Sequence, residues 1–496
     1  MKALARSHPD VLARRPRASK GALRSQMTRI VATLSAWSAR LEDRRVQPIL
    51  SAALVTLVWA TLVFVLGAGG PRDYWFEDDP LLFAISKSAA TPISFFVEHS
   101  LVQHALNPVE VVPMLFASFW VDTRIASSID TLPLVAMAHS ALSTLLAALL
   151  LQRLLARFVP IAAAAAAACL WLLLPSTQST LEFASTRCYQ EGLVFSLIAL
   201  LFCHRYLERD RVADLAGALV AAAFAMWSKE LFVATLPTLL GLLLLRARRY
   251  RAFFALVVLC FACASYRIWA VGWTLRYAMD PPRITDVFAL ARQIPRLSFA
   301  SGIGYVAWAL VLAGLAAIVV RRPERRGIVA IFLVTTLVAW LTLLPITHAL
   351  LQHNTGVTVW SRSLFVVNTI FAAACGWLLG ELRQRRAAFL GATFVFALGT
   401  YAALASIQAW NSLKQPLWAE TLLVLQHPNA VFISDAEAHW YFEGLERLYR
   451  DRPFPVVIHK GMSRAEIAHI QVRPDVPWYR LEGGVMVSCD PSACLQ

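Results

Sequence analysis

The stretch QPILSAALVTLVWATLVFVLGA, residues 47–68, decides the fold class, because it carries no charged residue and is long enough to cross a bilayer. An acidic segment, Asp73-Tyr-Trp-Phe-Glu-Asp-Asp-Pro80, follows within a few residues. Its three adjacent carboxylates, Glu77, Asp78 and Asp79, would lie at the membrane surface. Acid this dense at such a surface predicts either a structural partner or a function.

Two interpretations of this acidic triplet stay open. Asp79 directly precedes Pro80, so it is placed to cap a helix over residues 81–89. A cap uses one carboxylate, however, and leaves Glu77 and Asp78 unexplained. The functional interpretation makes Asp78, with Asp79 as second choice, a general base facing a lipid-borne substrate.

Composition indicates a multi-pass membrane protein. Of the 496 residues, 58% are hydrophobic and only 16% are charged, which is too apolar for a soluble chain of this length. The net charge is +15, but its positive residues cluster in short connections between apolar segments, which indicates membrane topology and not nucleic-acid binding. Residues 1–46 form a basic arm, which we expect in the cytoplasm of a bacterium, and the protein in its inner membrane.

We expect an all-α polytopic domain at 47–410 with about 11–12 membrane segments. The apolar segments that stand out are 47–68, 131–152, 159–175, 190–206, 213–228, 231–245, 252–272, 303–320, 328–346, 363–380 and 388–408. Arginines cluster in every second connection, which the positive-inside rule assigns to the cytoplasm. The connections left outside are 69–130, 176–189, 229–230, 273–302 and 347–362, together with the tail.

The first outward loop, 69–130, also contains two short apolar stretches, 80–90 and 109–119, that predict interfacial helices. The tail at 411–496 predicts a small extracytoplasmic α/β domain. Its strands are expected at 431–434 and 455–458, a helix at 435–450 and a hairpin at 478–488. Cys489 and Cys494 lie close together in this tail and are candidates for a disulfide.

Four polar motifs fall in the connections assigned to the outside. They are Glu77-Asp-Asp79, the turn from Leu174 to Gly192 with Glu182, Arg187 and Glu191, the segment Trp227-Ser-Lys-Glu230, and Trp360-Ser-Arg-Ser-Leu-Phe365. In their order and spacing they resemble the polytopic GT-C glycosyltransferases of the protein O-mannosyltransferase-like and TMTC-like branch. The resemblance covers most of the membrane region. Two features depart from that branch: Ser361 replaces the acid expected before Arg362, and the tail lacks tetratricopeptide repeats.

The resemblance implies a polyprenyl-phosphate-linked sugar as donor and an extracytoplasmic acceptor, which is a glycan, a lipid or a protein. Asp78 or Asp79 would then take the acceptor proton. Arg187, Lys229 and Arg362 are the candidate cations for the departing lipid phosphate, because fixed positive charge stabilises the negative charge that develops there. Supporting roles fall to Glu77, Glu182, Glu191 and Glu230. The partners are the donor, the acceptor and membrane lipids.

Each candidate also has a simpler interpretation. Arg187 and Glu191 are four residues apart and could form a helix-surface pair. The Lys229-Glu230 pair could mark a polar hinge, and Arg362 could extend to the lipid headgroups. The outward histidines show no spacing typical of a metal cage, so we expect neither a metal nor a cofactor.

Two other classes of function remain open. A transporter or flippase for a lipid-linked or anionic molecule would need charges in mid-span and matched broken helices in its two halves. A non-catalytic assembly subunit would keep the GT-C-like fold without the chemistry, and the Ser361 departure is its best support.

Overall fold

The computed structural model describes residues 46–68, 79–98, 112–247, 250–272, 283–352, 359–382, 385–434, 439–451, 453–459, 462, 476–482 and 485–490. It divides into two compact units, Met1–Ala53 and Leu54–Gln496. In the first unit, only the start of helix α2 (Gln47–Ala68) belongs to the described residues, so the predicted basic arm at 1–45 lies outside them.

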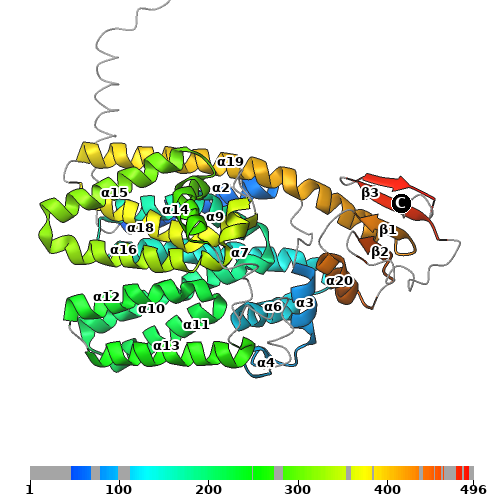
Figure 1. Cartoon of the computed structure of the whole chain (residues 1–496), viewed down its shortest axis with the longest axis horizontal. Coiled ribbons are helices and arrows are strands. Elements are labelled where there is room, and N and C mark those ends of the chain that lie inside the picture. The colour runs from blue at the N-terminus through cyan, green and yellow to red at the C-terminus, as the bar shows by residue number, and fades with distance from the viewer. Residues whose placement is uncertain are drawn as a thin grey trace, which may run out of the picture. The chain divides into compact units, whose positions relative to one another are not determined.

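Each of the eleven predicted apolar segments forms a helix (Figure 1). These helices are α2, α7 (Leu132–Leu155), α8 (Ile161–Leu173), α10 (Arg187–Arg209), α11 (Val212–Ser228), α12 (Thr235–Ala247), α13 (Tyr250–Val271), α15 (Ile303–Arg321), α16 (Arg326–Leu341), α18 (Phe365–Glu381) and α19 (Arg385–Gln426). By length and composition seven described helices can cross a membrane, or eight if the bent pair formed by α8 and α9 (Pro175–Glu182) counts as one span. The chain therefore has the architecture of a multi-pass membrane protein.

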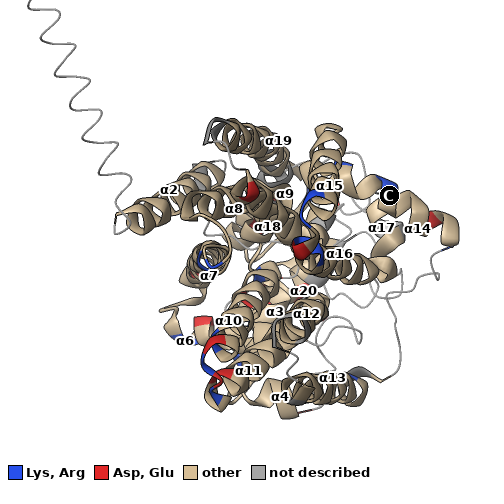
Figure 2. Ribbon diagram, turned by 90° about the vertical axis from the view of Figure 1, so that its left-hand side faces the viewer, with Lys and Arg blue, Asp and Glu red and all other residues tan. Residues whose placement is uncertain are grey.

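The basic turns gather at one end of these helices. Figure 2 looks onto this end and shows basic residues on the turns that follow α7, α10 and α15. Arg322, after α15, forms an ion pair with Glu381 in the last turn of α18. Gly380 in that turn packs against Val159, which follows α7. Connections that the arginine pattern assigned to one side thus lie together.

The alanine run at 162–168 packs α8 closely against α18. A Cβ atom placed on Gly376 would come within 2.6 Å of the Ala167 Cβ and 3.1 Å of the Ala163 carbonyl oxygen. Small residues on both helices let their backbones approach this closely. The alanine run thus serves helix packing.

The first loop forms helices α3 (Asp79–Ser88), α4 (Ser94–Val97) and α6 (Pro113–Ile125). The Phe83 ring on α3 stacks on Phe119 of α6, with ring centroids 4.1 Å apart. Leu81 and Leu82 are also buried. The two predicted interfacial helices therefore bury their apolar faces against protein.

One helix was not predicted within the connection 273–302. Helix α14 (Ile284–Phe299) buries Leu290, Ile294 and Leu297 on one face and packs against α15. Gly304 of α15 lies so near Pro295 that an added Cβ would clash with its carbonyl oxygen. Four shorter helical turns complete this half of the chain: η1 (Ile129–Thr131), η4 (Pro323–Arg325), η5 (Leu344–Ile346) and α17 (Thr347–Gln352).

The tail is a small α/β unit, as predicted. Strands β1 (Val431–Ser434), β2 (Val456–His459), β3 (Trp478–Glu482) and β4 (Val485–Ser488) form one sheet in the order β2-β1-β3-β4. Strand β1 runs parallel to β2 and β3, while β3 and β4 form the expected antiparallel hairpin. Helix α19 continues to Gln426 and leads directly into this unit, beyond the predicted boundary at 410 (Figure 1).

The tail packs tightly on the first loop through helix α20 (His439–Leu448). A Cβ on Gly444 would come within 2.3 Å of the Leu81 backbone nitrogen on α3. Burial raises the pKa of Tyr441 far above its ordinary value, and the neutral phenol hydrogen-bonds with the Thr421 hydroxyl of α19. Helix α20 thus connects α3 to the end of α19.

The cysteines fall into two classes. Cys169, Cys188, Cys203, Cys260, Cys263 and Cys375 are free and lie among the apolar helices. Cys489 is disulfide-bonded. Its predicted partner, Cys494, lies outside the described residues.

Candidate functional site

Helix α9 is the element around which the candidate site is built. It begins at Pro175, which suits a first helical position because the missing N–H is not needed there. The chain bends by 56° between α8 and α9. All eight residues of α9 are buried, and most of them are polar: Ser176, Thr177, Gln178, Ser179, Thr180 and Glu182.

The polar side chains of α9 bridge the break to α8. The Thr177 hydroxyl donates to the Trp171 carbonyl at 2.7 Å, and the Gln178 amide donates to the Leu173 carbonyl at 3.0 Å. These carbonyls belong to the last turn of α8, where intrahelical partners run out. We expected an exposed turn at 176–189; instead it is buried, because these side chains donate to the backbone and need no water.

The segment that follows, residues 182–191, is called the junction segment below. It comprises the end of α9, the turn η2 (Ala184–Thr186) and the start of α10. The Thr180 carbonyl accepts from the Thr186 hydroxyl at 2.9 Å and from the Gln190 amide at 2.5 Å. These two donors replace the helical turn that α9 does not continue, and they fix the path of the junction segment.

Asp79, which belongs to the first loop, binds the backbone of the junction segment. Its two carboxylate oxygens accept from the backbone N–H groups of Ala184 at 3.1 Å and Ser185 at 2.6 Å. The residue is only 3% exposed. Asp79 therefore caps the turn before α10, a role that the sequence did not predict. Glu77 and Asp78 lie outside the described residues.

Arg187 occupies a buried charge cluster. Its Nη2 lies 2.6 Å from Asp122 Oδ2 of α6, and its Nε lies 3.7 Å from Glu191 Oε1. The guanidinium also lies over the Phe119 ring, 4.7 Å from the centroid. Both Arg187 and Asp122 are fully buried. The predicted pair of Arg187 and Glu191 forms, but not at a helix surface, and Arg187 is not exposed as a phosphate ligand would be.

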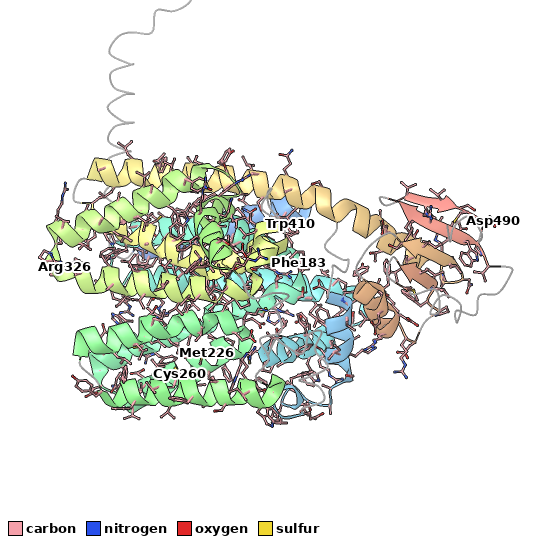
Figure 3. All side chains as sticks on the ribbon, viewed as in Figure 1. Phe183, Met226, Cys260, Arg326, Trp410 and Asp490 are labelled. Atoms are coloured by element: carbon pink, nitrogen blue, oxygen red, sulfur yellow. The ribbon has the colours of Figure 1, made fainter. Side chains whose placement is uncertain are left out.

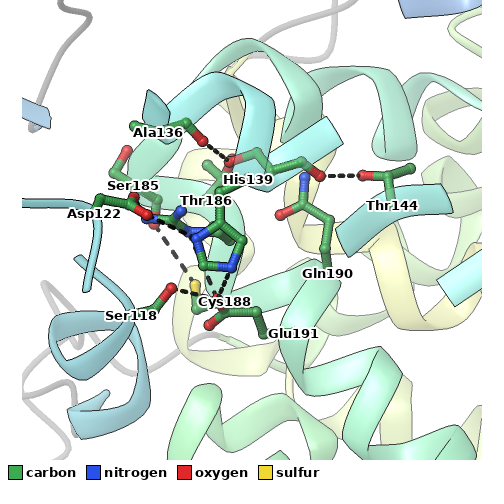
Figure 4. Close-up of polar contacts among 12 residues, drawn as sticks. Ser118, Asp122, Ala136, His139, Thr144, Ser185, Thr186, Cys188, Gln190 and Glu191 are labelled. Carbon is green, nitrogen blue, oxygen red and sulfur yellow. Dashed lines mark hydrogen bonds and ion pairs between the residues drawn. The ribbon is translucent and has the colours of Figure 1, made fainter. Parts of the chain in front are cut away.

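His139 of α7 completes this charge cluster (Figure 4). Its Nδ1 lies 2.8 Å from Asp122 Oδ1, and its Nε2 lies 3.7 Å from Glu191 Oε1. The Ser118 hydroxyl donates to the same Glu191 oxygen. With 34% of its side chain exposed, His139 is the most accessible residue of this charge cluster. The Asp122 carboxylate orients its ring.

Lys229 and Glu230 lie where α11 ends and the turn η3 (Glu230–Ala234) begins. Lys229 has an extended backbone there, which separates α11 from η3. Its Nζ lies over the ring of Tyr189, 5.7 Å from the centroid. The Glu230 carboxylate is 3.7 Å from Arg267 Nε of α13. The hinge therefore carries a half-buried cation directed at the junction segment.

Arg362 reaches the junction segment from the opposite side. It lies in the turn η6 (Val359–Leu364), which packs against α9, and its guanidinium is 5.5 Å from the centroid of the Phe183 ring. Phe183 also packs edge-on against Trp410 of α19, and Figure 3 labels both side chains. Ser361, where the resemblance would place an acid, is buried. Arg362 thus does not extend away from the protein toward headgroups.

Three residues that are distant from one another in the sequence therefore contact one ten-residue stretch. Asp79, Lys229 and Arg362 each contact the junction segment, which itself contains Glu182, Arg187 and Glu191. Sequence reasoning missed Asp122 and His139. The available signal was an acid and a histidine in or beside apolar helices, where ionisable side chains are costly and are often functional.

In the described part of the chain, no group of three or more His, Cys, Asp or Glu side chains is placed to hold a metal ion. The charged groups here form ion pairs with one another instead. The site thus places several carboxylates, one oriented imidazole and two half-buried cations around a fixed turn.

No protein-family model matches this chain, and no curated protein matches it significantly in sequence. The likeness to GT-C glycosyltransferases thus rests on the four motifs of the sequence alone.

Proposed function

We propose that this chain is an integral membrane glycosyltransferase of the GT-C type. It would transfer a sugar from a polyprenyl-phosphate carrier to a hydroxyl group of an extracytoplasmic glycan, lipid or protein. The observation that supports this proposal most is the meeting of Asp79, Lys229 and Arg362 on the junction segment. These residues come from three of the motifs on which the resemblance rests.

The reaction would be a single displacement. The acceptor oxygen attacks the anomeric carbon, its proton passes to a base, and the bond from that carbon to the phosphate oxygen breaks with its electron pair leaving on the phosphate. Lys229 and Arg362, both half-buried, would stabilise the charge on that phosphate. One displacement at the anomeric carbon inverts its configuration.

The base is assigned to Asp78. Asp79, its covalent neighbour, is committed to the N–H groups of Ala184 and Ser185, so Asp79 takes a positioning role in this proposal. Arg187 likewise becomes a positioning residue, because its guanidinium is buried against Asp122 and Glu191. His139 is the second candidate for the base, since Asp122 orients its exposed ring.

A transfer assay tests the proposal. The full-length protein, purified in lipid nanodiscs, is incubated with a panel of radiolabelled polyprenyl-phosphate sugars and with cell-envelope extract as acceptor. We expect release of polyprenyl phosphate and labelled product with at least one donor. Asp78→Asn should slow the reaction roughly 100-fold or more, the usual effect of removing a general base. The exposed Glu446→Gln on α20 is the control and should leave the rate unchanged.

Two outcomes decide between the bases and the proposal itself. If His139→Gln abolishes transfer while Asp78→Asn does not, the proton goes to His139. If no donor is consumed by the folded wild-type protein, or if both variants match it, the glycosyltransferase proposal is rejected.

One observation favours a second candidate, a transporter or flippase for a lipid-linked or anionic substrate. The bent pair of α8 and α9, with a buried polar half-helix, is the kind of broken helix that transporters use. Such folds carry matched breaks in two repeats, and the described residues hold one bent pair. Proteoliposomes that move a labelled lipid-linked sugar between leaflets without consuming it would favour this function. A non-catalytic assembly subunit would neither move the lipid-linked sugar between leaflets nor consume it.

A further inference from the structure

A second polar feature lies at the opposite end of α10 from the junction segment. A cavity of about 160 Å³ lies there, between the end of α7 and the last turns of α10. Its lining includes three arginines, one histidine and an apolar wall: Arg153, Arg157, Arg205, His204, Leu201 and Phe202. The proposed transfer reaction uses none of these residues.

The cavity carries an excess of positive charge. Arg205 is partly neutralised, because its Nε lies 3.2 Å from Asp214 Oδ1 and its guanidinium lies over the Phe202 ring. His204 faces Glu208, with 3.4 Å between Nδ1 and Oε1. Arg153 and Arg157 are exposed, and among the residues that the structure describes neither has an ion-pair partner. Two guanidinium groups at one cavity are thus available to an anion.

Orientation in the membrane alone does not explain this arrangement. The positive-inside rule requires arginines near the ends of spans but does not require a cavity between them. At the basic turn after α15, Arg322 and Arg325 both pair with Glu381 of α18. Among the described residues, the arginines at the end of α7 have no such acid, and they line a cavity instead.

The chemistry of the cavity fits a phosphate group. The planar fork of a guanidinium matches phosphate oxygens and binds them by charge-assisted hydrogen bonds. A water molecule takes up about 30 Å³ of liquid, so the volume corresponds to about five waters, enough for a phosphate with its first linking atoms. His204, which is buried, adds a polar group to the wall.

The surroundings indicate that a lipid carries this phosphate. The cavity lies at the end of α7, a candidate span of which only 39% is buried inside the protein. Leu146, two turns before the cavity, is 48% exposed, and Leu201 and Phe202 make the cavity wall apolar. Basic pockets between helices at this membrane face suit anionic headgroups. We infer that this cavity binds the phosphate of an anionic phospholipid from the surrounding bilayer.

Native mass spectrometry of the full-length protein tests the inference. Wild type in detergent is titrated with phosphatidylglycerol, with phosphatidylcholine and with inorganic phosphate as three separate arms. We expect phosphatidylglycerol to bind more tightly than phosphatidylcholine. The double variant Arg153→Gln/Arg157→Gln should bind it roughly 30-fold more weakly, since each of the two basic residues contributes about 1 kcal/mol to anionic-lipid affinity. Arg321→Gln, an exposed arginine of the same end without an ion pair among the described residues, should bind like wild type.

Each arm has an outcome that overturns the inference. Equal phosphatidylglycerol affinity in wild type and the double variant would show that the cavity is not the site. Inorganic phosphate that binds as tightly as the lipid would show that the ligand is a free anion. Should the double variant fail to fold, Arg157→Lys and Arg157→Gln are compared. Arg157→Lys, which keeps the positive charge, should retain more affinity for phosphatidylglycerol than Arg157→Gln. Equal losses of affinity in the two variants would contradict the role of charge.

Discussion

At the scale of single residues, the candidate site depends on charges that are buried in pairs. Arg187 and Asp122 are both fully buried, 2.6 Å apart at their nearest atoms. Removing one member of such a pair leaves the other charge without compensation, whereas neutralising both removes the cost and the attraction together.

We therefore expect Arg187→Gln or Asp122→Asn alone to destabilise the fold by about 3 kcal/mol, the usual cost of breaking a buried pair. The double variant should lose less unfolding free energy than the two single variants lose in sum. Thermal unfolding in detergent measures all three. If the two losses were strictly additive, Glu191 and His139 would be compensating the charge that each single variant leaves behind.

Asp79 gives a second test at this scale. Asp79→Ala removes two hydrogen bonds from backbone N–H groups to a carboxylate, and bonds to charged groups contribute about 1.5–3 kcal/mol each. We expect the amides of Ala184 and Ser185 to exchange with deuterium much faster in this variant. Asp286→Ala, whose carboxylate accepts from Arg283 at the exposed start of α14, is the control and should leave those amides protected. Unchanged exchange at residues 184 and 185 would contradict the capping role.

At the scale of elements, the sequence predicted the long helices well and the buried polar ones poorly. Uninterrupted apolar runs between arginine clusters indicate helices such as α7 and α15, because nothing else satisfies the backbone in lipid. Helix α9 has the composition of a surface turn. Two of its side chains donate to carbonyls of α8, and the Ser176 hydroxyl accepts from the Asn368 amide of α18, 192 residues away. Such distant partners cannot be inferred from local composition.

The same reasoning explains how the candidate site was only half predicted. Lys229, Arg362 and the junction segment stood out as charges at the ends of apolar runs. Asp122 and His139 were missed because they are the one acid of α6 and the one histidine of α7, and only the packing of α6 on α7 makes them a pair. The burial of Arg187 was missed for the same reason.

The polar contacts at the end of α9 can be tested with an isosteric pair. Thr186→Val removes the hydroxyl that donates to the buried Thr180 carbonyl, and we expect a loss of about 1 kcal/mol or more in unfolding free energy. Thr400→Val is the control, because Thr400 is exposed and donates to a carbonyl in its own helix. Equal effects of the two substitutions on the unfolding temperature would contradict a special role for the junction segment.

The packing of α20 on α3 gives another test at this scale. Gly444→Ala would force a Cβ to within 2.3 Å of the Leu81 backbone nitrogen, so the two helices must separate. We expect faster proteolysis within α3 and a lower unfolding temperature. Gly302→Ala places its Cβ where no atom lies within 4 Å, and it should behave like wild type. Resistance to protease in Gly444→Ala would show that α20 does not hold α3.

At the scale of the whole molecule, turns that the arginine pattern assigned to the cytoplasm meet one another, and polar turns assigned to the outside meet at the junction segment. Ion pairs between Glu381 and the arginines after α15 belong to the first set. The contacts of Asp79, Lys229 and Arg362 belong to the second. The alternation of basic and polar turns along the sequence therefore predicted which turns lie together.

Thiol labelling tests which end faces the cytoplasm. In a background without native cysteines, Glu446→Cys places an exposed thiol on α20, and Arg211→Cys places one in the basic turn after α10. We expect a membrane-impermeant reagent to label the first thiol in intact cells and the second only after the membrane is permeabilised. The opposite pattern would invert the topology and place the junction segment in the cytoplasm.

The hydrogen bonds of Asp79 also bear on how the chain is made. Its two donors, Ala184 and Ser185, are synthesised 105 and 106 residues later. At 5–20 residues per second, a ribosome needs roughly 5–20 s to produce them. During that interval the Asp79 carboxylate lacks these two donors. Assembly of the site therefore begins only once the first turns of α10 have emerged.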